Sequence, residues 1–472
     1  MEFNLEFPTE ILSIVFQELE TQDLISCSRT CWPWNATANS LLYETVSFYS
    51  HTKLQQFVGS ITGSQTHHEK CVESSISSHQ PLGQLVKSVE IITGYSHHDD
   101  IHSYSTMLSR LASKTPNVHA SYLGLPILSS DTDSGLPFDW SNLASQWTKL
   151  TNLSLKGSFG YELEPCDLNN INDVFNRLQH LNITRCEDIL THMLPSLPTM
   201  PYLQSFTATV YHTDDYQALK KILLNCQNTL HTLIIDFHSY LRPLSVNLDD
   251  FKIGRKQLKA FGLMKYDDSQ INITNFGDNL EHLEWWVYSK ETDETLKQSI
   301  HKAMIKTSSL KTLSFAGNMA LDHIPLVLDA NKNCLHTFYF DHMDGNDLIA
   351  RLQARNARLY NVTTLCFECM YLENSDIRAL AEIFPNVEFL ALCRNRRSRE
   401  MTRTISSGSK RTIWRLERGE EWIATDALSH FQHLKALDKI TFPELMDQSI
   451  STYQQCKILR PKHKGQPSVI PL

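Results

Sequence analysis

The sequence predicts an α/β solenoid: a small N-terminal three-helix domain, then an irregular repeat array forming an arc with a parallel concave sheet and a helical convex side. Three observations support this prediction. Apolar residues in the first fifty positions recur at helical spacing, a short apolar pattern repeats along most of the chain, and amphipathic segments separate several of its copies. The length of 472 residues also exceeds the roughly 250–300 at which a single core stops growing.

The N-terminal helices follow from apolar spacing and from proline positions. Pro8 fits the first turn of a helix, where a missing N–H has no cost. After it, apolar residues recur at three- and four-residue steps and form one stripe: Ile11, Leu12, Val15, Phe16 and Leu19. Thr21 is an N-cap residue type that opens a second short helix, and Pro33 fits the first turn of a third. A core this small is marginal alone, so a neighbouring element is expected to stabilise it.

This segment resembles an F-box, the module that attaches a substrate receptor to the Skp linker subunit of SCF-type cullin–RING ubiquitin ligases. The family pattern is L-P-x-E-I-L-x-x-I-F, then D-L, C-x-x-W and L-W. It is matched here by Phe7, Pro8, Glu10, Ile11, Leu12, Val15, Phe16, Asp23, Leu24, Cys31, Trp34, Leu42 and Tyr43. Phe7, Val15 and Tyr43 depart mildly from the pattern. The alternative is an ordinary helical N-terminal cap.

The resemblance implies that residues 1–50 dock onto the Skp linker and, through it, reach a cullin. The residues that it implies for linker binding are Pro8, Ile11, Leu12, Phe16, Leu24, Cys31 and Trp34. Sequence alone does not divide this set between the domain's own core and the linker surface.

The body of the chain carries a loose L-x-x-L-x-L pattern of apolar residues, which occurs ten times between Leu150 and Leu392. Successive copies start 22 to 30 residues apart, within or close to the 20–29 residues of leucine-rich repeats. Weaker copies start at Val86 and Val118, and a late copy lies at Leu437-Ile440-Phe442. A single copy is weak evidence, and the near-even succession is what predicts a repeat.

Helical segments with one apolar face lie between some copies, at 214–225, 295–306 and 375–384. A strand and a helix in each repeat predict a parallel sheet covered by helices on one side. The expected organisation is 1–50 F-box, 51–84 connector (partly loose), 85–445 leucine-rich-repeat solenoid and 446–472 C-terminal tail. An Arg-rich insertion at 394–418 is either a binding loop or a solvated loop.

The predicted strands also suggest where a target protein would bind. Because side chains alternate along a strand, the residues between the apolar repeat positions line the concave face. The candidate target-binding residues are Asp236, Glu284, Trp286, Tyr339, Asp341, Glu368 and Phe389. Exposed rings such as Trp286 and Tyr339 are typical hot spots, and the acids favour a basic partner segment. The alternative is that Trp285 and Trp286 both pack internally.

Composition argues against several other classes of protein. The 43 basic and 52 acidic residues give a net charge of −9, without the basic excess of a nucleic-acid binder. No apolar run is long enough for a transmembrane helix, and the N-terminus lacks the layout of a signal peptide. The eleven scattered cysteines fit reduced thiols in the cytoplasm or nucleus.

Motifs for catalysis and metal binding were not found, so we expect neither an enzyme nor a cofactor. Cys366-x-x-Cys369 has no second pair at zinc spacing, and Cys366 is interpreted as a small apolar residue on a strand. A second cluster is interpreted as a solvated loop, with metal binding as the alternative: His97, His98, Asp99, Asp100 and His102.

The sequence therefore predicts a substrate-recognition adaptor of a ubiquitin ligase, with a Skp-type linker and an unidentified protein target as its partners. The first alternative is a leucine-rich-repeat scaffold that acts outside a ligase. A second alternative keeps the F-box and the linker but assembles no full ligase.

Overall fold

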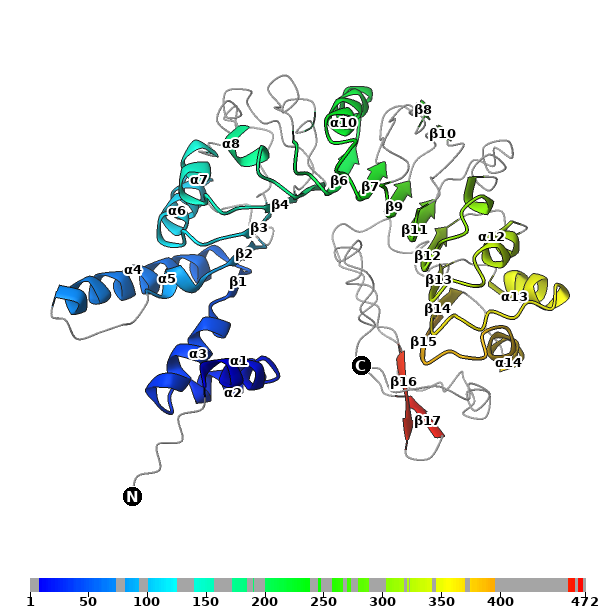
Figure 1. Ribbon diagram of the computed structural model, residues 1–472, viewed down its shortest axis with the longest axis horizontal. Helices are drawn as coiled ribbons and strands as arrows, with labels where there is room; N and C mark the ends of the chain where they lie inside the picture. Colours follow the sequence, from blue (N-terminus) through cyan, green and yellow to red (C-terminus); the bar gives the residue numbers. More distant parts are fainter. Residues whose placement is uncertain are drawn as a thin grey trace, which may run out of the picture. The chain divides into compact units, whose positions relative to one another are not determined.

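The computed structural model describes residues 8–73, 81–92, 101–124, 140–156, 172–184, 190, 200–237, 245–247, 257–265, 270–272, 279–287, 303–317, 321, 323–341, 345–369, 374–394, 457–462 and 466–469. The chain divides into two compact units, Met1–Thr229 and Leu230–Leu472. In each unit, parallel strands form a sheet with helices on one of its faces (Figure 1). The predicted α/β solenoid fold class is confirmed.

The first unit opens with three helices, α1 (Thr9–Gln17), α2 (Thr21–Cys27) and α3 (Trp32–Leu42). Pro8 is the N-cap of α1 and Pro33 lies in the first turn of α3, as the proline positions predict.

These three helices enclose a core of four buried side chains: Leu12, Phe16, Leu24 and Ala38. The Phe16 and Trp34 rings meet edge to face, with centroids 5.4 Å apart, which is a favourable aromatic geometry. Five partly buried side chains pack around this core: Leu19, Cys27, Trp34, Leu41 and Leu42. The fully buried core of the domain is therefore small.

The sheet of the first unit pairs each strand in parallel with the next one along the chain. Its strands are β1 (Thr45–Phe48), β2 (Ser88–Ile91), β3 (Ala120–Gly124), β4 (Asn152–Lys156), β5 (His180–Thr184) and β6 (Ser205–Val210). The helices of this unit that follow α3 are α4 (His51–Glu73), α5 (Leu82–Leu85), α6 (Ile101–Lys114), α7 (Trp140–Gln146), α8 (Asn172–Phe175) and α10 (Thr213–Asn225).

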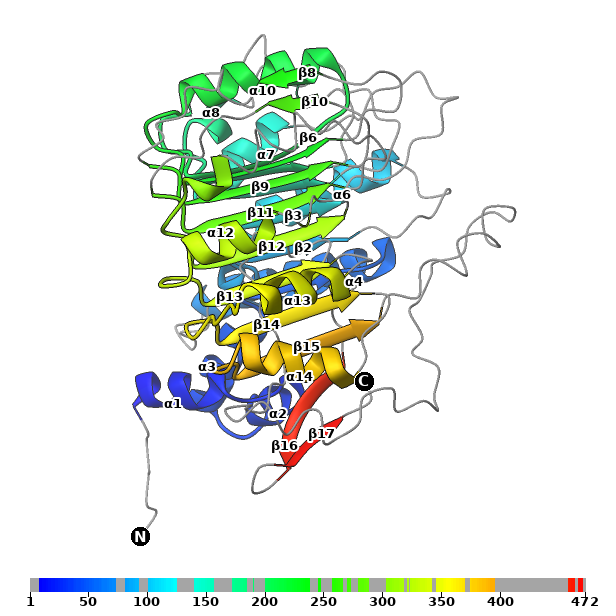
Figure 2. The same cartoon turned by 90° about the vertical axis from the view of Figure 1, so that its right-hand side faces the viewer.

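The second unit repeats this arrangement, and Figure 2 shows α12, α13 and α14 lying over its strands. Its parallel strands are β7 (Thr232–Phe237), β9 (Ala260–Lys265), β11 (His282–Val287), β12 (Thr312–Gly317), β13 (Thr337–Asp341), β14 (Thr364–Cys369) and β15 (Phe389–Arg394). The helices are α12 (Ile324–Ala330), α13 (Gly345–Ala354) and α14 (Asn374–Ile383), and β8 (Ser245–Asn247) pairs in parallel with β10 (Gln270–Asn272).

The apolar repeat positions form the core of both units. Every described residue of the ten L-x-x-L-x-L copies is 5% exposed or less. The weaker copies at Val86 and Val118 lead into β2 and β3, while the late copy at 437–442 lies outside the described residues. The repeat could be predicted from the sequence because three core positions recur at the same spacing in each of these strands.

A shared backbone contact marks the start of most repeat strands. The carbonyl of the residue that precedes one strand accepts two consecutive N–H groups from the start of the next. For Lys311, the donors are His336 N (2.8 Å) and Thr337 N (3.0 Å). The same pair of bonds is made by the carbonyls of Glu44, Lys87, His119, Thr151, Gln179, His231, Lys259, Glu281, His336 and Thr363. These bonds fix the register between neighbouring repeats.

Two segments differ from the expected organisation. The strand β1 falls inside the predicted F-box segment and pairs with β2, so the sheet starts at Thr45. Residues 51–73, expected to be part of a loose connector, form helix α4, in which Leu54, Val58 and Ile61 are buried. Glycine, serine and threonine surround these apolar residues, so the sequence shows only a weak helical pattern here.

The predicted C-terminal tail also contains strands. β16 (Lys457–Lys462) pairs antiparallel with β15, and β17 (Gln466–Val469) pairs antiparallel with β16. Except for Arg394, the Arg-rich insertion at 394–418 lies outside the described residues.

Candidate protein-binding sites

The second unit carries a row of acidic and aromatic side chains on the strand face opposite the helices. In register across neighbouring strands, one row reads Ile234, Gly262, Glu284, Ser314, Tyr339 and Cys366. The adjacent row reads Asp236, Met264, Trp286, Ala316, Asp341 and Glu368. Parallel pairing therefore brings together residues that are up to 132 positions apart in sequence.

Large side chains on this face close over small ones. The Trp286 and Tyr339 rings stack with centroids 5.8 Å apart, although β12 lies between their strands. Ser314 and Ala316 on β12 are small enough to allow this contact, and Trp286 Nε1–H donates to Ser314 Oγ at 2.9 Å. The indole is thus held in one orientation.

Glu284 lies in the same row over a glycine. A Cβ at Gly262 would lie 3.5 Å from Glu284 Oε2 and 3.2 Å from the Ile234 side chain, so the missing side chain gives both neighbours room. Glu284 is 3% exposed, and its Oε2 has no hydrogen-bond partner. Burial raises the pKa of this carboxyl to about 8.

A different kind of surface lies on helix α1. Leu12 and Phe16 face the small helical core, but Ile11, Ile14 and Val15 are 48%, 65% and 52% exposed. Three large apolar side chains thus face solvent along one helix. A patch of this kind on a small domain is typical of a protein-binding surface.

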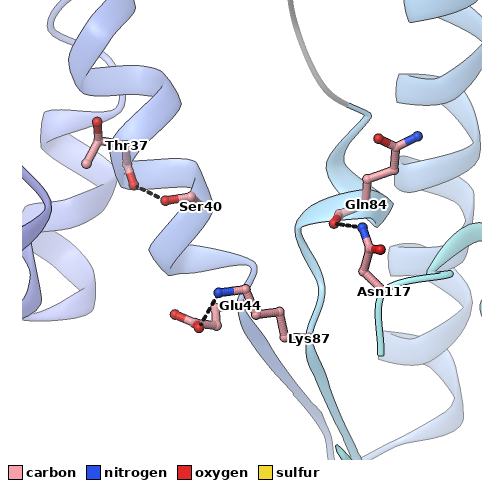
Figure 3. Close-up of polar contacts among 6 residues, drawn as sticks. All are labelled: Thr37, Ser40, Glu44, Gln84, Lys87 and Asn117. Atoms are coloured by element: carbon pink, nitrogen blue, oxygen red, sulfur yellow. Dashed lines mark hydrogen bonds and ion pairs between the residues drawn. The ribbon is translucent and has the colours of Figure 1, made fainter. Parts of the chain in front are cut away.

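The three-helix domain joins the repeats without a loose segment (Figure 3). Near the end of α3, Ser40 Oγ donates to the Thr37 carbonyl at 2.8 Å. Two residues past α3, the Glu44 carboxylate pairs with Lys87 Nζ at 2.9 Å. The backbone carbonyl of Glu44 accepts hydrogen bonds from the N–H groups of Lys87 and Ser88.

The next repeat continues this junction. Asn117 Nδ2 donates to the Gln84 carbonyl at 2.8 Å, which ties the turn before β3 to helix α5, just ahead of β2 (Figure 3). The first helices and the first strands of this unit are therefore linked by consecutive hydrogen bonds.

Comparison with known proteins bears on the N-terminal helices. Residues 5–49 match the family model described as F-box-like. The N-terminal domain is F-box-like. No curated protein matches the chain. Among solved structures, the chain is similar to one in the crystal structure of the Rad7 and Elc1 complex in yeast, with 14% identity and a TM-score of 0.43. That similarity covers 81% of this chain and 88% of the other.

The structure divides the predicted linker-binding residues of the F-box-like domain into two groups. Leu12, Phe16 and Leu24 belong to its core, and Trp34 packs against that core while half-buried. Pro8, Ile11 and Cys31 are exposed.

Ile14 and Val15 were absent from the predicted linker-binding set, although both are exposed on the same helix as Ile11. The i, i+3, i+4 spacing of Ile11, Ile14 and Val15 was the available signal.

The predicted target-binding residues have a different outcome. Asp236, Glu284, Trp286, Tyr339 and Asp341 lie on neighbouring strands, as expected, but each is 7% exposed or less. The expectation that Trp286 and Tyr339 are exposed is wrong. Their binding role stays a prediction.

Trp285 and two further predicted target-binding residues, Phe389 and Glu368, lie in different environments. Trp285 is buried on the core side of β11, while Trp286 faces the other side of the strand. Phe389 is half-buried on β15, and the side chain of Glu368 lies outside the described residues.

The cysteine and histidine positions considered for metal binding form no metal site among the described residues. Cys366 is fully buried on β14, while 97–100 lie outside the described residues, as does the side chain of His102 in α6. Among the described residues, no group of three or more His, Cys, Asp or Glu side chains could hold a metal ion. Within the same residues, no helix combines the length and apolar character needed to cross a membrane.

Proposed function

We propose that this chain is a substrate-recognition adaptor of an SCF-type E3 ubiquitin ligase. The F-box-like domain docks onto a Skp-type linker and through it joins a cullin, and the repeats bind the target protein. The observation that carries the proposal is the exposed apolar face of α1 on a domain that matches the F-box-like family. This role belongs in the cytoplasm or nucleus.

The docking surface centres on Ile11, Ile14 and Val15. Fully burying an aliphatic side chain of this size stabilises a complex by about 1.5–3 kcal/mol. Leu12 and Phe16 are enclosed in the core. In this proposal they support the docking surface from within the domain.

The adaptor contributes proximity and no bond chemistry of its own. Holding a target beside the ubiquitin-charged enzyme turns a bimolecular encounter into an effectively intramolecular one. The hydrogen-bonded junction around Glu44 supports this role, because it connects the docking domain to the first repeats without a flexible linker.

The test compares two double variants of α1. Ile14→Glu with Val15→Glu places two charges in the proposed interface, while Thr9→Glu with Gln17→Glu places two charges at exposed positions outside it. The first pair should weaken capture of a purified Skp-type linker more than tenfold, equivalent to at least about 1.4 kcal/mol, and the second should bind normally. Titration calorimetry measures both, and circular dichroism checks that each variant is folded.

Equal linker affinity for the two double variants would contradict docking through α1. Failure of the unaltered chain to bind any Skp-type linker would favour a repeat scaffold that acts outside a ligase. Linker binding without recovery of a cullin from cell extract would favour a chain that uses the linker but assembles no full ligase.

A further inference from the structure

The strand face of the second unit has an excess of acidic residues. Its described strand-face positions carry Asp236, Glu284 and Asp341, and Glu368 occupies the position in register with Asp341. β16, at the edge of the sheet beside β15, places Arg460 and Lys462 at positions of this face. Among the positions of β7 to β15, only His282 could carry a positive charge. The other positions are Thr232, Ile234, Ala260, Gly262, Met264, Trp286, Thr312, Ser314, Ala316, Thr337, Tyr339, Thr364, Cys366, Phe389, Ala391 and Cys393. The face therefore complements a cation.

Glu284 is the residue of this face that most needs a partner. Its Oε2 is buried and makes no hydrogen bond, and no partner among the described residues is found for the carboxyl. A buried polar group without a hydrogen bond is costly, and such groups in folded proteins call for an explanation. An N–H donor that carries a positive charge would supply both the missing bond and the missing charge.

The surroundings restrict what this donor can be. Glu284 and its neighbours are nearly buried, so only the end of a long and slender side chain could reach the carboxyl. Arginine and lysine carry their charge on such an apolar stem. Trp286 lies two residues along the same face of β11 and stacks on Tyr339. Both rings are nearly buried, and aromatic rings attract a cation that comes into contact with them.

We propose that Glu284, with Trp286, Tyr339, Asp236 and Asp341, receives an arginine or lysine side chain from a basic segment of the target protein. This inference rests on the proposed function, in which the repeats bind a target. It adds the chemical class of the recognised group and names Glu284 as the residue that selects it.

Binding of a cation at this position is linked to a proton. A vacant Glu284 keeps its proton near neutral pH, because burial raises its pKa to about 8. An arriving cation stabilises the carboxylate, so binding releases the proton and tightens as the pH rises toward 8.

Few other groups near Glu284 could contribute to this pH dependence. β9 and β12 flank β11 and present no titratable side chain on this face: Ala260, Gly262, Met264, Thr312, Ser314 and Ala316. Farther away, β7 presents Asp236, and β13 presents Tyr339 and Asp341. His282 on β11 itself has a lowered pKa, mainly because it is partly buried, and is neutral above pH 7.

The test uses two fluorescein-labelled nine-residue peptides of glycine and serine with two arginines or, in the matched peptide, two citrullines. Citrulline keeps the shape of arginine and removes its charge. Fluorescence anisotropy with the full chain bound to its Skp-type linker should give at least tenfold tighter binding for the arginine peptide. Glu284→Gln should abolish this preference. Glu281→Gln, which removes a carboxylate just before the same strand, should retain it.

The preference for arginine should also grow between pH 7 and 8 in the unaltered chain and stay flat in Glu284→Gln. Equal binding of the two peptides, or an arginine preference that survives Glu284→Gln, overturns the proposal. A preference gained only after Arg396, Arg397 and Arg399 are replaced by serine identifies a segment of this chain as the occupant, which also overturns it. Linker capture in the same samples reports separately on docking of the F-box-like domain.

Discussion

At the scale of single residues, two carboxyls only three positions apart experience opposite environments. Glu281 lies just before β11, where a hydrogen bond from Lys311 Nζ at 2.6 Å lowers its pKa. Glu284 lies on the strand face, where burial raises its pKa to about 8. The ionised form therefore stabilises the fold at Glu281 and destabilises it at Glu284.

Replacing Glu284 should consequently change how stability depends on pH. The ordinary carboxyl pKa of about 4.5 is that of the unfolded chain, so between pH 4.5 and 8 the unfolded chain releases a proton that the folded chain keeps. Stability of the unaltered protein should fall across this window, by up to about 1.4 kcal/mol per pH unit. Glu284→Gln removes that loss. The free energy of unfolding in urea of the variant, relative to that of the unaltered chain, should therefore increase from pH 5 to pH 8.

Glu281→Gln is the matched control and has the opposite sign. The lowered pKa of Glu281 means that its contribution is present above the ordinary pKa and is lost as the pH falls. This variant should be slightly less stable than the unaltered chain at pH 7 and equal to it in acid. A Glu284→Gln advantage that is constant with pH would show that Glu284 does not titrate in this window.

Sequence reasoning placed Glu284 and Trp286 on the correct face but wrongly expected Trp286 to be exposed. Alternation along a strand determines which face a side chain takes, and it says nothing about what covers it. Exposure here depends on neighbouring strands that are tens of residues away. Gly262, Ser314 and Ala316 are small, so larger side chains on the flanking strands close over them.

At the scale of secondary-structure elements, α1 shows why a helix with one predicted apolar stripe can serve two purposes. The stripe included Ile11, Leu12, Val15 and Phe16, but the structure buries Leu12 and Phe16 and exposes the other two. Hydrophobic spacing identifies residues that avoid water. It does not distinguish the domain's own core from the surface reserved for a partner, because both are apolar.

Two helical glycines give a matched pair of predictions. A Cβ at Gly59 in α4 would meet nothing within 4 Å, whereas a Cβ at Gly83 in α5 would lie 2.1 Å from the Lys114 carbonyl oxygen. Gly59→Ala should therefore raise stability by about 0.5–1 kcal/mol, because alanine restricts the unfolded chain. Gly83→Ala should lower the thermal midpoint, because α5 and the end of α6 must move apart.

Thermal unfolding of the two alanine variants beside the unaltered chain decides this prediction. A loss of stability in Gly59→Ala would mean that α4 does not form an ordinary solvent-facing helix at this position. An unchanged midpoint in Gly83→Ala would mean that the close approach of Gly83 to Lys114 is not required by the fold.

At the scale of the whole molecule, the repeat was predictable and its starting point was not. Ten apolar triplets reveal the strands from β4 to β15 other than β8 and β10, since the described residues of every triplet are buried at the same i, i+3, i+5 spacing. β1 has only four residues, of which Val46 and Phe48 are buried, and it follows α3 after two residues. So short a strand leaves no periodic signal, which is why the F-box and the repeats were expected to be separated.

The position of β1 predicts different outcomes for two truncations of the N-terminus. A chain that starts at Glu44 loses the three helices but keeps β1 paired with β2. A chain that starts at His51 loses β1 as well, which exposes the backbone edge of β2 and uncovers the apolar side chains that Val46 and Phe48 pack against. Exposed strand edges of this kind promote association between chains.

Light scattering and thermal unfolding of both truncations measure this difference. The chain from Glu44 should remain monomeric, while the chain from His51 should associate and unfold at a lower temperature. If the two behaved alike, β1 would contribute nothing to the sheet. If they differ as expected, removing residues 1–50 disturbs the repeats as well as linker binding. Point substitutions at Ile14 and Val15 are then the proper way to separate docking from target recognition.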